Sequence, residues 1–149
     1  MKRAGGALAL FALAVAGPAA ASGPRFKGGI NYPVGVQIGL SGDRDGPGFS
    51  LGLEASVVAV DDSLSWVGLV GAVDHDWGRG GGAAALALEG GWAFMGAEVG
   101  VTRGFAGDLG LRLRAVSPWI FGAVYLGYEG LDGGRMVGGV LFKWPFGME

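Results

Sequence analysis

The chain contains no cysteine and a single histidine, and only 16% of its 149 residues are charged. The absence of cysteine excludes a disulfide framework, a thiolate zinc site and a cysteine nucleophile. There is no run of basic residues that could bind the phosphates of a nucleic acid, so nucleic-acid binding is not expected. A linker, a heptad pattern and a low-complexity tail are also missing, and a single domain is therefore expected at this length.

The beginning of the chain has the layout of a secretory signal peptide. Two basic residues precede a largely apolar run over residues 4–16, and three alanines at positions 19–21 supply a small-residue cleavage site. We predict a signal peptide over residues 1–21 and one mature domain over residues 22–149. A retained membrane anchor is disfavoured because the apolar run is shorter than the ~20 residues of a spanning helix. The mature domain has 9 basic and 13 acidic residues, a formal net charge of −4.

Glycine is abundant, and 30 of the 33 glycines lie in the mature domain. Collagen would require a three-residue period with abundant proline, and disorder would require low hydrophobicity, whereas half of this chain is apolar. Much of the glycine alternates with apolar residues. Glycine in a strand relieves crowding where a sheet bends or closes tightly, so this pattern favours a curved sheet.

Eight runs between residues 26 and 146 read as short strands. They cover residues 30–41, 49–60, 64–73, 83–89, 95–102, 109–114, 119–129 and 139–144. In most of them apolar residues share one parity and polar or glycine residues the other, which predicts strands with two unlike faces. The third and seventh runs are apolar on both parities, so their facing stays open. The fourth could be a short helix on propensity alone, but the neighbouring turn signals favour a hairpin.

The connections between these runs alternate between longer and shorter segments. The longer ones are expected over residues 42–48, 75–82, 104–108 and 131–135, and the tight ones near residues 61–63, 90–91 and 117–118. Outer-membrane barrels have an even strand count, short periplasmic turns and longer outer loops. The fold class predicted is therefore all-β: an eight-stranded antiparallel up-and-down transmembrane β-barrel after a cleaved signal peptide.

The last run ends in Gly139-Val140-Leu141-Phe142-Lys143-Trp144, a glycine followed by alternating apolar or aromatic positions. With this ending and the strand pattern, the mature chain resembles the family of small eight-stranded outer-membrane barrels that includes the OmpA transmembrane domain and OmpX. The resemblance implies the outer membrane of a Gram-negative bacterium, with outer-membrane lipids and the outer-membrane assembly machinery as partners. It also implies an insertion signal at Gly139, Phe142 and Trp144.

A soluble periplasmic barrel of the lipocalin kind, binding a ligand inside, is the main alternative architecture. It would turn the apolar parity inward and expose the other parity to water. A water-facing surface is normally about a quarter charged, whereas the polar parity here carries about one charge per strand among Gly, Ala and Ser. The membrane barrel is favoured for this reason, and hydrocarbon would demand that the sheet close on itself.

An outward apolar parity places several charged side chains in the lumen. The residues expected there are Glu54, Glu89, Glu98, Arg112, Arg114, Glu129 and Lys143. An unpaired charge in a narrow interior costs several kcal/mol, so we predict an ion-paired network in which the guanidinium groups bridge glutamates. Such a network fills an eight-stranded barrel as a polar plug, and a narrow path for ions or small solutes is the functional alternative.

Four tryptophans fall near the predicted periplasmic ends of the strands: Trp66, Trp92, Trp119 and Trp144. Tryptophan at that depth is typical of an interfacial girdle. The parity of Trp92 and of Trp119 opposes that of the apolar neighbours, so an inward orientation or a bulge stays open for these two.

No motif in the chain predicts an active site, a metal site or a cofactor. His75, flanked by Asp74 and Asp76 on the predicted second outer loop, could serve a lipid-modifying enzyme, but no serine stands nearby in the sequence. The segment 43–46 lacks the later ligands of a calcium loop and reads as a turn, and the segment 79–82 lacks the lysine of a phosphate loop. A structural or surface-interaction role is therefore expected, with no catalytic residue and no cofactor.

Overall fold

The computed structural model describes residues 29–43, 46–119, 121–131 and 133–144. The predicted signal peptide lies outside the described residues, as do Arg44 and Asp45 of the predicted turn. The described residues form strands and connections without a helix. None of this part of the chain is therefore a helix of the length and hydropathy needed to cross a membrane.

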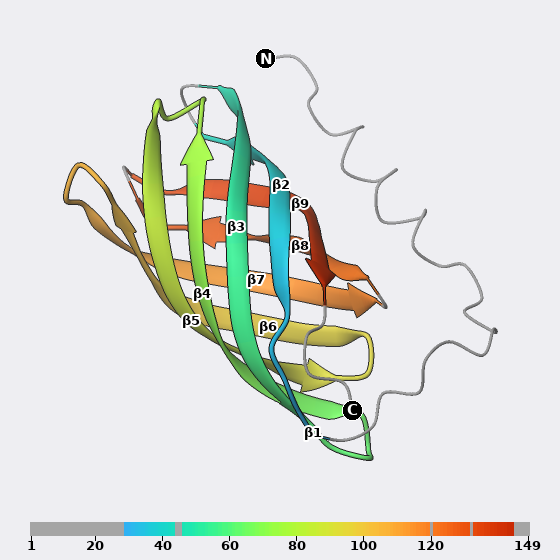
Figure 1. Cartoon of the computed structure of the whole chain (residues 1–149). Helices are drawn as coiled ribbons and strands as arrows, with labels where there is room; N and C mark the ends of the chain where they lie inside the picture. Colours follow the sequence, from blue (N-terminus) through green and yellow to red (C-terminus); the bar gives the residue numbers. More distant parts are fainter. Residues whose placement is uncertain (1–28, 44–45, 120, 132, 145–149) are drawn as a thin grey trace.

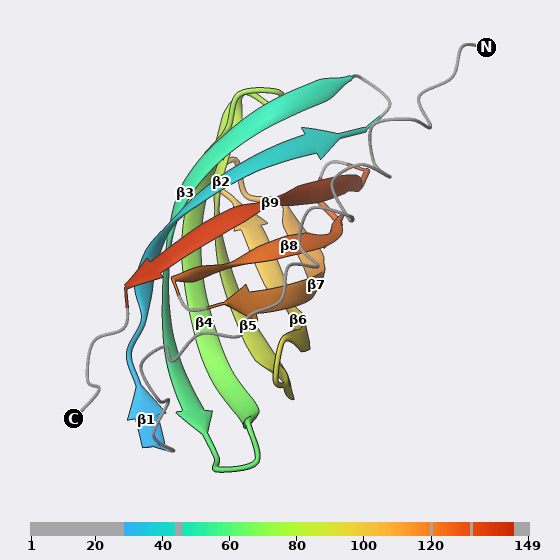
Figure 2. The same cartoon turned by 90° about the vertical axis from the view of Figure 1, so that its right-hand side faces the viewer.

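Nine antiparallel strands make up the described fold (Figure 1). They are β1 (Gly29–Asn31), β2 (Val34–Gly42), β3 (Pro47–Val60), β4 (Ser65–Asp76), β5 (Gly81–Trp92), β6 (Met95–Gly104), β7 (Leu109–Trp119), β8 (Gly122–Glu129) and β9 (Arg135–Trp144). From β2 to β9 each strand pairs with its neighbours in sequence, and β9 also pairs with β2. The predicted eight-stranded up-and-down barrel is confirmed, and Figure 2 shows the strands curving around its interior.

The first strand of the barrel is interrupted, which the sequence did not predict. The short β1 pairs only with β3, and the partners Asn31↔Val58 and Val34↔Ala55 keep one register across the gap. The interruption falls at Pro33, which has no backbone N–H to donate. From Val34 onward β2 bonds to both β3 and β9, so closure begins directly after the proline.

The register fixes the stagger of the barrel. Starting at Ile30, successive partners run through Ala59, Val67, Gly90, Ala97, Ala115, Leu126 and Gly138 and return at Leu40. One circuit therefore shifts the chain by ten residues along its first strand, from 30 to 40. With eight strands, such a shift corresponds to a strand tilt of about 40° from the barrel axis.

Burial alternates along almost every strand, and it settles the two facings that the sequence left open. In β4, Val70 and Ala72 are buried inside while Leu69 and Val73 are exposed outside. In β8, Tyr125 faces the interior and Leu126 the exterior. The fourth run is a strand, so the helical alternative is wrong.

Several predicted connections are wrong, because the strands extend further than their apolar residues. Residues 90–91 belong to β5 and residues 117–118 to β7, so the chain passes from β5 to β6 at residues 93–94 and from β7 to β8 at residues 120–121. Together with residues 61–64 they form what we call the turn end. The connections at the opposite end, the loop end, are residues 43–46, 77–80, 105–108 and 130–134. They have four or five residues each, and the first two are clearly shorter than the predicted 42–48 and 75–82, so the connections at the two ends differ little in length.

The turn at residues 61–64 is built around one carboxylate. Asp61 Oδ1 accepts hydrogen bonds from the Ser63 hydroxyl at 2.6 Å, the Ser63 N–H at 2.8 Å and the Ser65 N–H at 3.0 Å. These bonds, the one from the Ser63 hydroxyl first, lower the pKa of Asp61 below its ordinary value. The indole N–H of Trp92 donates to the Ser63 carbonyl at 2.9 Å and ties this turn to the end of β5.

Glycine is required where Tyr125 crosses the interior. Gly39 and Gly139 are direct partners between β2 and β9, and a Cβ built on either would collide with the Tyr125 hydroxyl. A Cβ on Gly139 would also meet the carbonyl oxygen of Ile38, which belongs to the backbone and cannot turn aside. Glycine at both positions thus gives the tyrosine its place beside the ladder that closes the barrel.

We expect Gly139→Ala to lower the free energy of unfolding by about 1–3 kcal/mol, because the added methyl group overpacks this contact. Gly42→Ala, on the same ladder but with open space around its Cβ, is the matched control and should change stability by less than about 0.5 kcal/mol. Equilibrium urea unfolding of the folded barrel measures both. Equal midpoints for the two variants would contradict the packing assigned to Tyr125.

Candidate functional site

The interior of the barrel holds all seven charged residues that the sequence predicted there. Glu54, Glu89, Glu98, Arg112, Arg114 and Glu129 have relative exposures of 0–5%, and the Lys143 side chain is 15% exposed. Each takes the inward parity of its strand, opposite the exposed apolar residues. Because these side chains come from six different strands, only closure of the sheet brings them together.

Glu54, on β3, is the centre of the network. Its Oε1 lies 2.7 Å from Lys143 Nζ, and its Oε2 lies 3.5 Å from Arg112 Nη2 and 3.9 Å from Arg114 Nη1. One carboxylate thus faces three cations from β7 and β9. In the low-dielectric interior these attractions are far less screened than in water, so Glu54 compensates charges that have little access to solvent.

Two branches lead from this centre toward the turn end. Arg112 Nε pairs with Glu98 Oε1 at 2.5 Å, and Lys143 Nζ lies 3.8 Å from Glu89 Oε1. Lys143 also donates a hydrogen bond to the Ser56 hydroxyl at 3.2 Å. Lys143 is the penultimate residue of β9, so the network reaches close to that end of the barrel.

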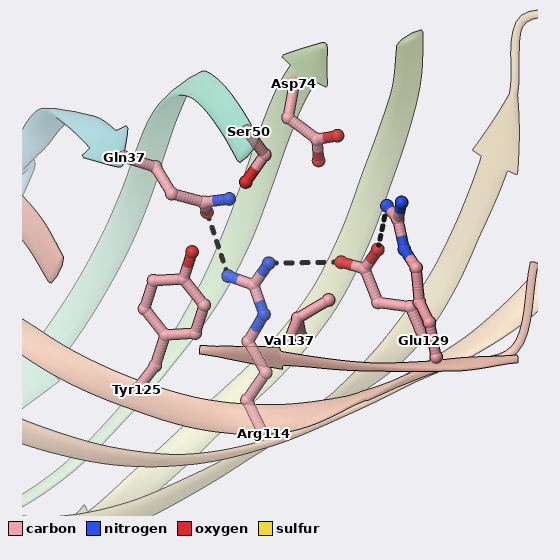
Figure 3. A pocket seen from close by; sticks show the side chains of 8 residues that line it. Gln37, Ser50, Asp74, Arg114, Tyr125, Glu129 and Val137 are labelled. Carbon is pink, nitrogen blue, oxygen red and sulfur yellow. Dashed lines mark hydrogen bonds and ion pairs between the residues drawn. The ribbon is translucent and has the colours of Figure 1, made fainter. Parts of the chain in front are cut away.

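A third branch runs to the loop end (Figure 3). Arg114 donates to Gln37 Oε1 at 2.9 Å and to Glu129 Oε1 at 3.1 Å, and its guanidinium lies over the Tyr125 ring at 4.2 Å from the centroid. Glu129 Oε2 accepts from Arg135 at 3.0 Å, and Arg135 in turn pairs with Asp76. The ion pairs of these three branches form one continuous chain along the interior, from Asp76 to Glu98 and Glu89.

Sequence reasoning missed Asp74, Asp76 and Arg135, because it assigned them to connections. All three are buried: β4 continues to Asp76, and β9 begins at Arg135. The signal was present, since both aspartates continue the parity of residues 70 and 72. Asp74 reaches Arg79 at 3.8 Å, which joins the 77–80 connection to the interior. Gln37 and Tyr125 were missed because neither carries a charge at neutral pH.

The prediction that His75 lies on a loop is wrong. The residue lies near the end of β4. It faces outward and contacts the Trp77 ring edge-on at 4.8 Å, whereas Asp74 and Asp76 face inward. The strand parity therefore separates the imidazole from both flanking carboxylates, and they cannot orient it as a base. Among the described residues no group of three or more His, Asp or Glu side chains is placed to share a metal ion.

Three of the four predicted interfacial tryptophans lie outside the barrel. Trp92, Trp119 and Trp144 are 65%, 41% and 67% exposed near the turn end. The expectation for Trp66 is wrong: it has the inward parity of β4, and its indole lies against Gly91 and Gly96. The missing side chains at those two glycines leave the space that the ring occupies.

The residues of the expected insertion signal all lie in the closing strand. Phe142 and Trp144 face outward, and Gly139 faces Tyr125 inside. Their strand, β9, pairs with β8 on one side and β2 on the other, so these positions sit at the seam where the barrel closes.

The interior is filled at both ends as well as in the middle. Toward the turn end Val116, Ala123 and Leu141 form a buried apolar cluster, and at the loop end Leu131 is 2% exposed. The gap beside Arg114, Tyr125 and Glu129 in Figure 3 leaves no space for a water-sized sphere. This arrangement can hold the wall of the barrel in register.

We expect Glu54→Gln to lower the free energy of unfolding by about 3–5 kcal/mol, since it leaves buried cations without compensation. Glu89→Gln is the matched control, because within the described residues its one ion pair is a contact of 3.8 Å with Lys143, and it should lower the free energy of unfolding clearly less. Urea unfolding of both variants tests the difference. A loss at Glu89 as large as that at Glu54 would show that Glu54 is not the centre of the network.

Comparison of the chain with protein-family models, with curated proteins and with solved structures found no match. The function therefore has to be inferred from the wall of the barrel and from its interior.

Proposed function

We propose that this protein is a small outer-membrane β-barrel with a plugged, charge-paired interior and a structural or surface-interaction role. The observation that carries the proposal is the composition of the outward wall. Halfway along the strands the outward residues are aliphatic, as at Leu53, Leu86, Val99 and Leu126, which are 47–58% exposed. In water, so continuous an apolar wall around a small barrel would favour aggregation.

Aromatic residues are concentrated at both ends of this wall. The turn end carries Tyr32, Trp92, Phe94, Trp119, Phe121 and Trp144, and the loop end carries Phe49, Trp77, Phe105 and Tyr128, all at least 40% exposed. An apolar band about 25 Å tall between two aromatic girdles is typical of barrels that cross a bilayer. The ladder between β2 and β9 removes the strand edges that hydrocarbon would not tolerate.

The placement of apolar side chains outside and ion pairs inside argues against the two alternative functions, a soluble ligand-binding barrel and an ion channel. A lipocalin-like barrel keeps its apolar side chains inside around a ligand cavity, whereas here the apolar side chains face outward and the interior holds ion pairs. An ion channel is also disfavoured, because apolar side chains are buried toward both ends of the interior, Leu131 at the loop end and the Val116, Ala123 and Leu141 cluster at the turn end. In planar bilayers the reconstituted protein should give no discrete conductance steps.

Substituting arginine at two depths of one strand tests the membrane assignment. Val99 lies in the middle of β6 and Met95 at its first residue, both on the outward face. We expect Val99→Arg to destabilise the barrel folded in lipid by about 2–4 kcal/mol and Met95→Arg by only about 0–1 kcal/mol. Refolding into phosphatidylcholine vesicles, followed by heat-modifiable migration on a gel, measures both. Similar behaviour of the two variants would indicate that no bilayer surrounds β6.

Fractionation of cells that express the full chain tests the location directly. The protein should remain with the sarkosyl-insoluble outer membrane, and protease should reach it from outside only at the loop end, where the connections have four or five residues. Recovery in the soluble periplasmic fraction would contradict the proposal and favour the soluble barrel.

A further inference from the structure

Two basic residues interrupt the apolar outward wall, one on β4 and one on β6. Within the described strands, His75 and Arg103 are the outward-facing residues that carry a basic side chain. Each is the second-last residue of its strand, β4 for His75 and β6 for Arg103, so both lie near the loop end. In the membrane orientation proposed above, that depth is where lipid headgroups begin.

The two residues flank the same strand. His75 pairs directly with Gly82 of β5, and Arg103 pairs directly with Ala84 of β5. With strands ~4.8 Å apart and a rise of ~3.3 Å per residue, their Cα atoms are about 12 Å apart across β5. Between them on β5 lie Gly82, over which the Phe105 ring packs, and Ala84, so no long side chain of β5 itself stands between His75 and Arg103.

Arg103 differs from the interior cations in having no carboxylate partner. Arg79, Arg112, Arg114, Arg135 and Lys143 each form at least one ion pair. Neither Arg103 nor His75 forms one with any residue in the described part of the chain. An outward guanidinium at the edge of hydrocarbon is stabilised by an anion from its surroundings, and guanidinium geometry suits the oxygens of a phosphate.

Aromatic rings surround this pair on the side of the loops. Trp77 contacts His75 at 4.8 Å and Phe49 at 5.5 Å, and Phe105 lies over Gly82, where a Cβ would come within 2.7 Å of its ring. Exposed aromatic rings of this kind are suited to the boundary between headgroup and acyl chain. The charged pair is thus framed by groups that contact the apolar part of the same lipid molecule.

We infer that His75 and Arg103 form a binding site for the phosphate monoester of an anionic membrane lipid, across β5 at the loop end. The inference rests on the proposed membrane location. Arg103 supplies the permanent charge and bidentate N–H donors, and the imidazole of His75 supplies a further N–H donor. The occupant is a lipid, because the site opens onto the outward wall and not onto the interior or a loop cavity.

The test uses the imidazole signals of His75, the one histidine of the chain, in nanodiscs of phosphatidylcholine titrated with phosphatidic acid at constant pH. We expect a saturable shift of these signals and at least a tenfold weaker apparent affinity in Arg103→Gln. Met136→Glu is the control, since it changes the net charge by the same amount near the loop end on β9, four strands away from β5 on either side. It should leave the titration nearly unchanged.

The results that would contradict the lipid-phosphate site can be told apart from one another. Equal effects of Arg103→Gln and Met136→Glu, or an equal shift with oleic acid in place of phosphatidic acid, would mean that only the surface potential is sensed. A shift with millimolar inorganic phosphate in pure phosphatidylcholine would assign the site to a soluble anion. No shift in a barrel that is inserted and heat-modifiable would remove the site and leave the proposed function standing, whereas failure to insert would remove both.

Discussion

Closure of the sheet by the ladder between β2 and β9 is the constraint on which the other features of this protein depend. The nine partner pairs from Val34↔Trp144 to Gly42↔Met136 turn one face of every strand into an enclosed interior. Eight strands enclose little more than the volume of their own side chains. Water is then largely excluded, and every inward charge has to find an opposite charge from another strand.

The ion pairs show how that requirement is met. Glu54 on β3 can compensate Arg112 and Arg114 because β7 lies opposite β3 in the barrel, and it can compensate Lys143 because only β2 separates β3 from β9. A network of this kind adds little net stability over an apolar filling, since desolvation offsets much of the Coulomb attraction. It does penalise other registers, because a shift by one residue would turn every charge toward the exterior. The charges therefore contribute mainly to the specificity of the barrel.

Glycine and aromatic residues complete the same wall. Tyr125 occupies the space above Gly39 and Gly139, and Trp66 occupies the space at Gly91 and Gly96. On the outside the chain has no comparable need for pairing, because the wall is apolar over most of its height. His75 and Arg103 are the exceptions. They place two basic side chains on the otherwise apolar exterior, near the loop end between β4 and β6.

The sequence by itself determined the strands, most of their facings and the seven charges of the interior, since alternation with period two is a local property that strand geometry imposes. It misjudged where strands end, as at Asp74, Asp76 and Arg135, because the end of a strand depends on what its partner continues to bond. Only the tertiary structure decided the ten-residue stagger, the central position of Glu54 and the inward turn of Trp66. These follow from contacts between residues far apart in the chain, and no local pattern records which strand will face which across a closed barrel.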